Sequence, residues 1–216
     1  MKKFDTVVFD MDGTILNTLD DLKDAMNYIL RSHGYPEKTL EECRRAVGNG
    51  ARRFLADMLP QGEADPEFEA LLKEYGVYYQ GHSQIKTRPY DGIVDLMEAL
   101  KEKQIKMAIV SNKGDGPVKD LNRKYFGDLI ETAVGERPGI RRKPEPDSVL
   151  EALKILGSSR ETAVYVGDSV GDYHTAANAG MNCVLVSWGF RDREQLEALK
   201  PDYIIDCPEE LLEIFK

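Results

Sequence analysis

The chain has 216 residues, of which 42% are hydrophobic and 31% charged, and a formal net charge of −9 at pH 7. This length is enough for one large domain or for a core domain with a smaller insert, and the composition is that of a globular protein. The acidic balance argues against a nucleic-acid partner, and no apolar run approaches the roughly 18 residues that would span a membrane.

The cysteines and the start of the chain indicate a reducing compartment. Cys43, Cys183 and Cys207 are widely spaced and form no C-x-x-C pattern, so neither a disulfide framework nor a zinc site is predicted. No signal-peptide pattern follows Met1. We therefore expect a cytoplasmic protein, with a monomer or weak homodimer as the default state.

Short β-rich runs alternate with helical patterns over most of the chain. The spacing predicts β-α-β units around a mostly parallel sheet, which is the α/β class. Strands are predicted at 4–9, 105–110, 162–167, 182–186 and 202–206, and helices at 91–102, 115–125, 145–156, 171–180 and 208–215.

The interval between the first two predicted strands is too long for one crossover. About ninety-five residues lie there, where a dozen or so are enough to connect parallel strands. Helical patterns fill the interval at 19–31, 39–47, 50–59 and 66–81, with breaks at 48–50 and 60–66. We therefore predict a small helical cap domain at 17–84, inserted into a core formed by 1–16 and 85–216.

Polar residues cluster around the predicted strand ends. In open α/β sheets, ligands bind at the carboxyl ends of the strands, so these residues are expected to form one site. Each alone is an ordinary turn, loop or helix cap. They are Asp10 and Asp12 after the first strand, Ser111, Asn112 and Lys113 after the second, Lys143 before the strand at 162, and Asp168 and Asp172 after it.

This set of residue types suits a phosphate monoester. Several carboxylates beside a phosphate dianion would repel it unless a hard divalent cation lay between them, and Mg²⁺ prefers carboxylate, water and phosphate oxygens. Asp10, Asp168 and Asp172 are the predicted metal ligands, with the Asp12 carbonyl as a further one. Lys143, together with the Ser111 hydroxyl and the adjoining Asn112, is predicted to bind the phosphoryl oxygens.

The two aspartates at the end of the first strand have different predicted roles in the reaction. A carboxylate beside Mg²⁺ and a lysine stays ionised and can attack phosphorus, which gives an aspartyl-phosphate and splits the hydrolysis into two steps. Asp10 is the predicted nucleophile. Asp12, turned aside at Gly13, is the predicted general acid for the leaving alcohol and general base for the attacking water.

Four ordered motifs carry a family resemblance. With DMDGT at 10–14, SNK at 111–113, KP at 143–144 and GDSVGD at 167–172, the chain resembles the haloacid-dehalogenase-like phosphatases. The resemblance implies a Rossmann-like doubly wound core, a helical cap after the first motif, Mg²⁺, and the same roles for Asp10, Asp12, Ser111, Lys143, Asp168 and Asp172. Three further segments look most like the phosphoglycolate phosphatase group: GNGARRFL at 48–55, KPEPD at 143–147 and AGMNCVLVSWGF at 179–190.

The expected function is therefore Mg²⁺-dependent hydrolysis of a small phosphorylated metabolite, such as a phosphoglycolate-like monoester. A phosphosugar mutase or a pyrophosphatase of the same family is the alternative. A mutase would need the cap to retain a bisphosphorylated intermediate, and the cap offers no clear lysine or histidine pair for that task. A phospho-acceptor signalling domain is an alternative of another class, although such chains are usually shorter and uncapped.

Two cations near the start of a predicted cap helix have two interpretations. Arg52 and Arg53 follow the flexible Gly48-Asn49-Gly50 segment, at a helix end where the dipole disfavours positive charge. Either they lie on a solvated helix face, or one of them contacts the carboxylate or hydroxyls of a substrate when the cap closes.

Overall fold

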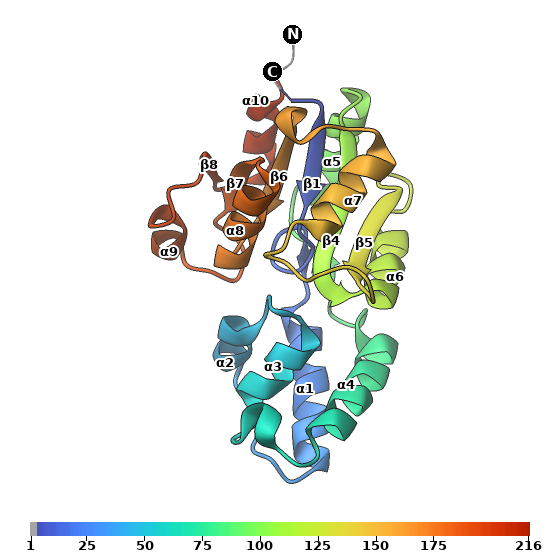
Figure 1. Cartoon of the computed structure of the whole chain (residues 1–216), viewed down its shortest axis with the longest axis vertical. Coiled ribbons are helices and arrows are strands. Elements are labelled where there is room, and N and C mark those ends of the chain that lie inside the picture. The colour runs from blue at the N-terminus through green and yellow to red at the C-terminus, as the bar shows by residue number, and fades with distance from the viewer. Residues whose placement is uncertain (1–3) are drawn as a thin grey trace.

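The structure is a computed structural model that describes residues 4–216. Residues 1–3, which the predicted core range includes, lie outside the described residues. A layer built on a β-sheet forms one half of the molecule, and four helices form the other half (Figure 1). We call these halves the sheet layer and the helical layer.

A six-stranded parallel sheet organises the first half. Its order is β5-β4-β1-β6-β7-β8, so the chain builds from the central β1 to one edge and later to the other. This confirms the predicted α/β class with a mostly parallel sheet. The strands are β1 (Thr6–Phe9), β4 (Lys106–Gly114), β5 (Thr132–Glu136), β6 (Ala163–Gly167), β7 (Asn182–Val186) and β8 (Tyr203–Ile205).

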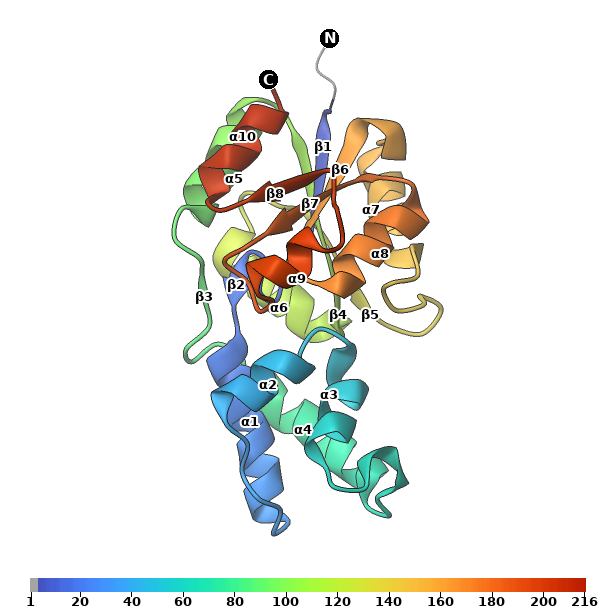
Figure 2. The same ribbon diagram turned by 90° about the vertical axis from the view of Figure 1, so that its left-hand side faces the viewer.

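Both faces of the sheet are covered by helices. Successive strand residues point to opposite faces, so Val7 and Phe9 belong to one hydrophobic cluster and Val8 to another. The first cluster includes side chains of α5, α6 and α10, and the second includes side chains of α7, α8 and α9. Figure 2 shows α5 and α10 on one side of the sheet and α7 and α8 on the other. The helices are α5 (Ile93–Glu102), α6 (Asp115–Phe126), α7 (Asp147–Leu156), α8 (Val170–Ala179), α9 (Arg193–Glu197) and α10 (Leu211–Ile214).

The helical layer has a hydrophobic core of its own, in which Met26, Leu55 and Tyr75 are buried. Its helices match the four predicted ones to within two residues at each end. The division of the chain at 17 and 84 stays a prediction. The helices are α1 (Leu19–Ser32), α2 (Leu40–Ala46), α3 (Gly50–Met58) and α4 (Phe68–His82).

Short elements connect these parts. The chain enters and leaves the helical layer through an antiparallel pair, β2 (Leu16–Asn17) and β3 (Arg88–Pro89). Three 3₁₀ turns, at Gly62–Ala64, Arg160–Thr162 and Pro208–Glu210, join neighbouring elements. The last of these replaces the first turn of the helix predicted at 208–215.

Besides these short connecting elements, β5 and α9 were not predicted. β5 has the sequence TAVGE, whose glycine and glutamate are uncommon in strands, and α9 spans only five residues. Gly135 has a packing reason that the local sequence does not reveal. A Cβ atom at this position would lie 2.5 Å from the Cα atom of Asp115, so only glycine allows β5 to approach the start of α6.

β4 is also longer than predicted. Ser111, Asn112 and Lys113 lie within the strand and not after it, because the backbone stays extended as far as Gly114. The register of β4 against β5 shifts between Val110 and Gly114, which is typical of a bulge that redirects side chains at a sheet edge.

Two arginines, one from each layer, donate hydrogen bonds to the other layer. Arg44 of α2 donates to the carbonyl oxygen of Phe190 at 2.7 Å and pairs with Asp192 at 3.1 Å. Arg191 donates to the carbonyl oxygens of Arg44 and Val47, both at 2.8 Å, where α2 ends and its carbonyls lack helical partners. The Phe190 side chain is buried in the hydrophobic cluster of the helical layer. Residues 190–192 are therefore fixed to α2.

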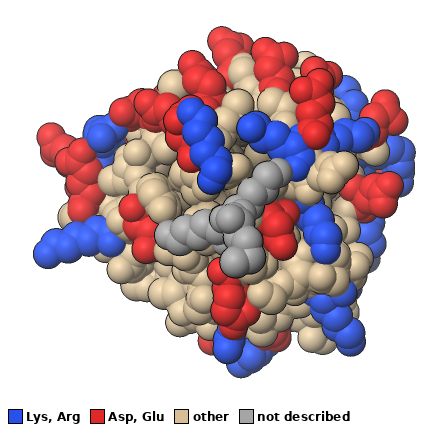
Figure 3. Space-filling view, turned by 90° about the horizontal axis from the view of Figure 1, so that it is seen from above, with Lys and Arg blue, Asp and Glu red and all other residues tan. Residues whose placement is uncertain are grey.

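The end of the sheet layer that points away from the helical layer carries charges of both signs. In the described part of this face, Lys and Arg side chains lie among Asp and Glu side chains (Figure 3). It therefore offers no broad basic surface of the kind that binds a phosphate backbone, in keeping with the net charge of −9. No helix within residues 4–216 is long and apolar enough to cross a membrane.

Asp21 links α1 to the segment that returns to the sheet layer. Its buried carboxylate accepts the backbone N–H groups of Ile85, Lys86 and Thr87 at 2.8–3.1 Å. We expect Asp21→Ala to lower the free energy of unfolding by about 2–4 kcal/mol, because these groups lose a charged acceptor. Urea denaturation measures the change. Asp24→Ala, which removes an exposed ion pair on the same helix, is the control and is expected to change the free energy by less than about 1 kcal/mol. Equal losses in both variants would contradict the proposed anchoring.

Candidate active site

The turn after β1 brings the ends of two strands together. The Asp10 N–H donates to the carbonyl oxygen of Val166 at 2.8 Å, which continues the pairing of β1 with β6. Gly13 then has φ +88°, and a Cβ atom there would lie 2.4 Å from Oδ2 of Asp168. Only glycine satisfies both constraints. The DMDGT sequence therefore allows the turn after β1 to lie directly against the loop after β6.

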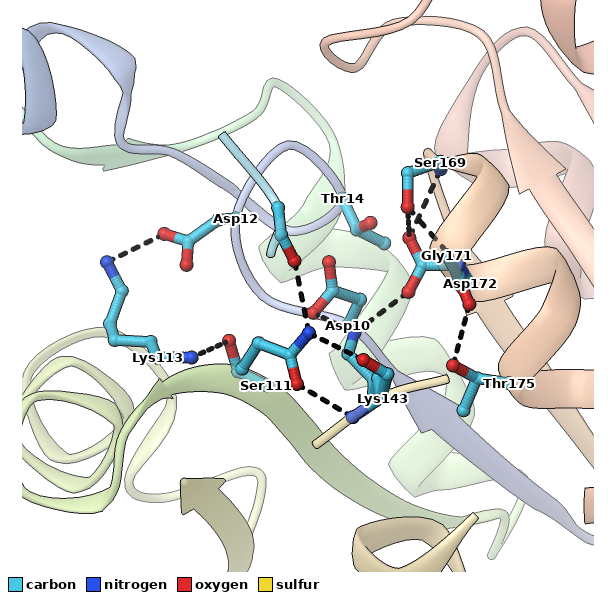
Figure 4. Close-up of polar contacts among 12 residues, drawn as sticks. Asp10, Asp12, Thr14, Ser111, Lys113, Lys143, Ser169, Gly171, Asp172 and Thr175 are labelled. Carbon is cyan, nitrogen blue, oxygen red and sulfur yellow. Dashed lines mark hydrogen bonds and ion pairs between the residues drawn. The ribbon is translucent and has the colours of Figure 1, made fainter. Parts of the chain in front are cut away.

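Lys143 lies at the centre of the buried charges. Its Nζ is 2.6 Å from Oδ1 of Asp10 and 2.8 Å from Oδ1 of Asp172 (Figure 4). The same ammonium group also donates to the hydroxyl of Tyr165 at 2.9 Å. The Tyr165 hydroxyl in turn donates to Asp172 at 2.8 Å. One ammonium group thus links the loop after β1 to the first turn of α8.

Asn112 holds the Lys143 backbone in place. Its side-chain oxygen accepts the Lys143 N–H at 2.8 Å, and its Nδ2 donates to the carbonyl oxygens of Lys143 at 3.1 Å and Gly48 at 3.2 Å. Both amide hydrogens are used, so the side chain has no donor left for a phosphoryl oxygen. The side chain therefore positions Lys143 in this structure, and phosphate binding by Asn112 stays a prediction. Ser111 differs, because its hydroxyl accepts the Lys113 N–H at 3.2 Å and keeps its own O–H for another acceptor.

The loop after β6 presents two further carboxylates. Oδ2 of Asp172 accepts the N–H and the hydroxyl of Ser169 and the N–H of Asp168, which begins α8 with a capping box. Asp168 accepts the Phe190 N–H at 2.7 Å and the Thr14 hydroxyl at 3.3 Å. All oxygens of Asp172 and Asp168 thus have donors, whereas Oδ2 of Asp10 has none among residues 4–216.

The carboxylates and the lysine alter one another's ionisation. Burial, followed by the charge of Asp172, raises the pKa of Asp10 well above its ordinary value, and the same two causes raise the pKa of Asp168 from 3.8 to about 7. Burial also opposes ionisation of Asp172, but Lys143 outweighs it and lowers that pKa. Burial disfavours charged Lys143, yet Asp10 and Asp172 more than offset it and keep the pKa of Lys143 above its ordinary value. The lysine therefore stays charged, and its charge favours the ionised form of all three carboxyl groups.

This arrangement can hold a divalent metal ion. Asp10, Asp168 and Asp172 each offer a carboxylate oxygen, and these oxygens lie within 4.8 Å of one another. When ionised, they and Lys143 give the buried group a net charge of −2, which a divalent cation would balance. The donor set consists of hard oxygens. The Asp12 carboxylate lies outside this group. Metal ligation by the main-chain carbonyl oxygen of Asp12 stays a prediction.

Asp12 forms a separate pair on the cavity side. Its Oδ1 accepts the Thr18 hydroxyl at 2.6 Å and lies 2.8 Å from Nζ of Lys113, which also donates to the hydroxyl of Tyr79 in α4 at 2.5 Å. Figure 4 shows Asp12 and Lys113 pointing toward each other, apart from the Lys143 network. The two aspartates of the turn after β1 therefore lie in different environments.

A cavity of about 350 Å³ lies between the two layers. Asp10, Asp12 and Ser111 line it from the sheet layer, and α1, α3 and α4 form the facing wall. Arg52 and Arg53 are absent from the lining. Arg52 pairs with Glu63 and Glu69, and Arg53 pairs with Asp57, all within the helical layer. In this structure the arginines contact acidic residues of their own layer, as the solvated-face interpretation expects.

Several contributors to the site had no role assigned to them by the sequence reasoning. The DMDGT motif contains Thr14, and SNK contains Lys113, so each was visible but had no assigned role. Tyr165 looked like a core residue, because it lies in an apolar strand. The Phe190 N–H gave no indication at all, since a backbone donor is recognised only when its acceptor is placed nearby.

The arrangement matches a known family. A model of the haloacid dehalogenase-like hydrolases covers residues 7–186. The chain belongs to this family. Membership in the haloacid dehalogenase-like hydrolases makes it an enzyme, so the signalling-domain alternative does not apply.

Similar proteins of this hydrolase family include phosphatases. Phosphoglycolate phosphatase 1 of Pseudomonas aeruginosa is 32% identical over 95% of this chain and 78% of its own length. N-acetylmuramic acid 6-phosphate phosphatase of the same organism is 30% identical over 96% of this chain and 93% of its own length. A crystal structure from Lactobacillus delbrueckii subsp. bulgaricus, provisionally named a phosphoglycolate phosphatase, superposes with a TM-score of 0.93 at 36% identity. It covers 100% of this chain and 99% of its own.

The raised pKa of Asp168 predicts that Asp168→Asn changes the thermal stability of the protein in a pH-dependent way when EDTA is present. The folded protein binds the proton of the Asp168 carboxyl group more tightly than the unfolded chain does. The stabilisation of the folded state by this proton is therefore complete below about pH 4 and is lost as pH rises through about 7. We expect the variant and the wild type to have similar Tm values near pH 4.5, and the variant to become progressively more stable toward pH 7.5. Each unit of pKa difference corresponds to about 1.4 kcal/mol.

Differential scanning fluorimetry across this pH range measures the difference in Tm. Addition of Mg²⁺ at pH 7.5 is expected to raise the Tm of the wild type more than that of the variant, because the variant lacks one carboxylate. A difference in Tm that does not change with pH would contradict the assigned environment of Asp168.

Proposed function

We propose that the protein hydrolyses phosphate monoesters through a phosphorylated Asp10. The observation that carries the proposal is the state of the Asp10 carboxylate. One oxygen is held by Lys143 at 2.6 Å, while the other faces the cavity without a hydrogen-bond donor among residues 4–216. A carboxylate fixed in this way is oriented for attack and keeps a free lone pair.

In the first half of the reaction, Oδ2 of Asp10 attacks phosphorus, and the bond from phosphorus to the alcohol oxygen breaks. Asp12 gives its proton to that oxygen, so a neutral alcohol leaves and a phosphoaspartyl group remains. Lys143 would stabilise the negative charge on the phosphoryl oxygens through its own positive charge, and the Ser111 hydroxyl would donate to one of them.

In the second half, water attacks phosphorus of the phosphoaspartyl group. Asp12, now ionised, takes a proton from this water, and the bond from phosphorus to Asp10 breaks. Inorganic phosphate leaves and both aspartates return to their starting states. Lys113 and Thr18 hold the Asp12 carboxylate throughout, which keeps it directed toward the cavity.

We further propose Mg²⁺ as the metal, held by Asp10 and Asp168 with Asp172 behind them. Hard oxygen donors and a net charge of −2 support this choice. When bound, the metal would neutralise phosphoryl charge and keep Asp10 ionised despite its burial. The phosphatase names of the relatives support a small phosphorylated metabolite as the substrate, and phosphoglycolate is the first one to test.

Asp10→Asn is expected to fold normally and to lose turnover of phosphate esters by at least about 10³-fold, because the amide is a poor nucleophile and a poor metal ligand. Phosphate release in the presence of Mg²⁺ measures turnover, and circular dichroism checks the fold. Asp24→Asn, on the exposed face of α1, is the control. Turnover by Asp10→Asn close to that of the wild type would refute the nucleophile assignment.

Asp12→Asn is expected to affect esters according to their leaving group. Alkyl esters need a proton on the departing oxygen, so their turnover should fall by about 10²–10⁴-fold. p-Nitrophenyl phosphate releases a stable anion, so its first step should fall much less, as measured by the burst of p-nitrophenol in rapid-mixing experiments. An equal loss for both kinds of ester would argue against Asp12 as the general acid.

A further inference from the structure

The helical layer presents an apolar, aromatic wall to the cavity. Its apolar and aromatic residues are Leu22, Val47, Ala51, Phe54, Tyr75 and Tyr79, and Gln80 is the one amide side chain that the helical layer adds among the described lining residues. The Phe54 and Tyr75 rings meet edge to face with centroids 6.1 Å apart, and the Tyr75 and Tyr79 rings stack at 5.8 Å. These contacts hold the rings in fixed orientations, so the wall is preformed.

Cations around the cavity already have partners. Lys113 is the one cation among the described lining residues, and it pairs with Asp12 and donates to Tyr79. Arg142 lies beside Gly50, where a Cβ atom would be 3.5 Å from its Cζ, but Arg142 pairs with Glu136 at 2.6 Å. Arg191 lies beside Gly48 and donates to backbone carbonyl oxygens at the end of α2.

A substrate with a carboxylate on its alcohol part would therefore meet an unfavourable surface. Its charge would lose water against apolar side chains. The charged residues among the described lining are Asp10, Asp12 and Lys113, and the lysine already pairs with Asp12. Burial of an unpaired charge is strongly unfavourable, whereas a neutral group gains from contact with the same wall.

The cavity is also larger than the smallest phosphorylated acids require. At roughly 30 Å³ for each water, a volume of about 350 Å³ corresponds to about a dozen water-sized groups. A phosphoryl group fills less than half of that space. The remainder suits a ring-sized alcohol that can lie against Phe54 and Tyr75.

Tyr75 adds one polar contact to this wall. Its side chain is 2% exposed and lines the cavity, and its hydroxyl has no hydrogen-bond partner among residues 4–216. The residue borders the cavity, so its hydroxyl can donate to or accept from a polar atom of a ligand there. We propose that the substrate is the phosphate ester of a neutral, ring-sized alcohol with an apolar face and a polar atom that meets Tyr75. This inference rests on the proposed phosphatase function.

The test compares esters that differ only in charge or in size. Isobutyl phosphate has nearly the shape of phosphoglycolate without its carboxylate, and benzyl phosphate adds a ring. With Mg²⁺, we expect kcat/KM for isobutyl phosphate to exceed that for phosphoglycolate by at least about tenfold, and benzyl phosphate to be better still. A kcat/KM for phosphoglycolate equal to or above that for isobutyl phosphate would overturn the inference.

The same comparison of esters distinguishes failure of the proposed function from failure of the inference. Absence of phosphate release from every ester, p-nitrophenyl phosphate included, would remove the phosphatase proposal itself. Release that prefers phosphoglycolate would keep the phosphatase and overturn only the neutral-alcohol inference. Alanine variants of Arg52 and Arg53 extend the comparison, and a selective loss of phosphoglycolate turnover in either variant would also overturn it.

Phe54→Leu tests the aromatic wall without opening a large hole. We expect kcat/KM for benzyl phosphate to fall about three- to tenfold and that for isobutyl phosphate to stay within about twofold, because leucine keeps the wall apolar and removes the ring. Thermal unfolding checks that the variant folds. Equal effects on both esters would contradict stacking of the substrate against Phe54.

Discussion

The active-site geometry depends on one buried ammonium group. Nζ of Lys143 contacts Asp10 from the loop after β1, Asp172 from α8 and Tyr165 from β6. β1 and β6 are neighbours in the sheet, at the point where the strand order reverses. Without this charge, the neighbouring carboxylates would repel each other in a site that excludes water. The same lysine leaves the acidic group with a residual negative charge, so the arrangement that stabilises the loops also creates the requirement for a metal.

The helical layer is linked to this centre through the backbone. Asp168 accepts the Phe190 N–H, and the Phe190 side chain lies in the core of the helical layer. Arg44 and Arg191 fix the same segment to α2. A change in the position of α2 would therefore reach Asp168, a proposed metal ligand, through three consecutive residues, which is a physical route by which the position of the helical layer can affect the proposed chemistry.

The two layers divide recognition of the substrate. In the proposed mechanism the sheet layer supplies the groups that recognise a phosphoryl group and a metal, and these groups do not distinguish one alcohol from another. The helical layer supplies a wall whose apolar side chains and occupied cations favour neutral groups. Relatives named for phosphorylated acids are about 30% identical to this chain, which leaves ample room for a different wall. Family membership and substrate class are thus separate properties of this chain.

The sequence alone was sufficient for the β-α-β rhythm and for the four helices between β1 and β4, because hydrophobic periodicity is local. Strand-end motifs, which are also local, pointed to Asp10, Asp12, Ser111, Lys143, Asp168 and Asp172, whose roles stay predictions. It missed β5, whose Gly135 is explained only by the distant Asp115, and it left Arg52 and Arg53 undecided. Tertiary structure alone decided that Asn112 holds the Lys143 backbone, that Lys113 pairs with Asp12, and that the cavity wall lacks a free cation among the described residues. Each of these depends on which side chains from distant segments reach the same place, and local patterns carry no information about such contacts.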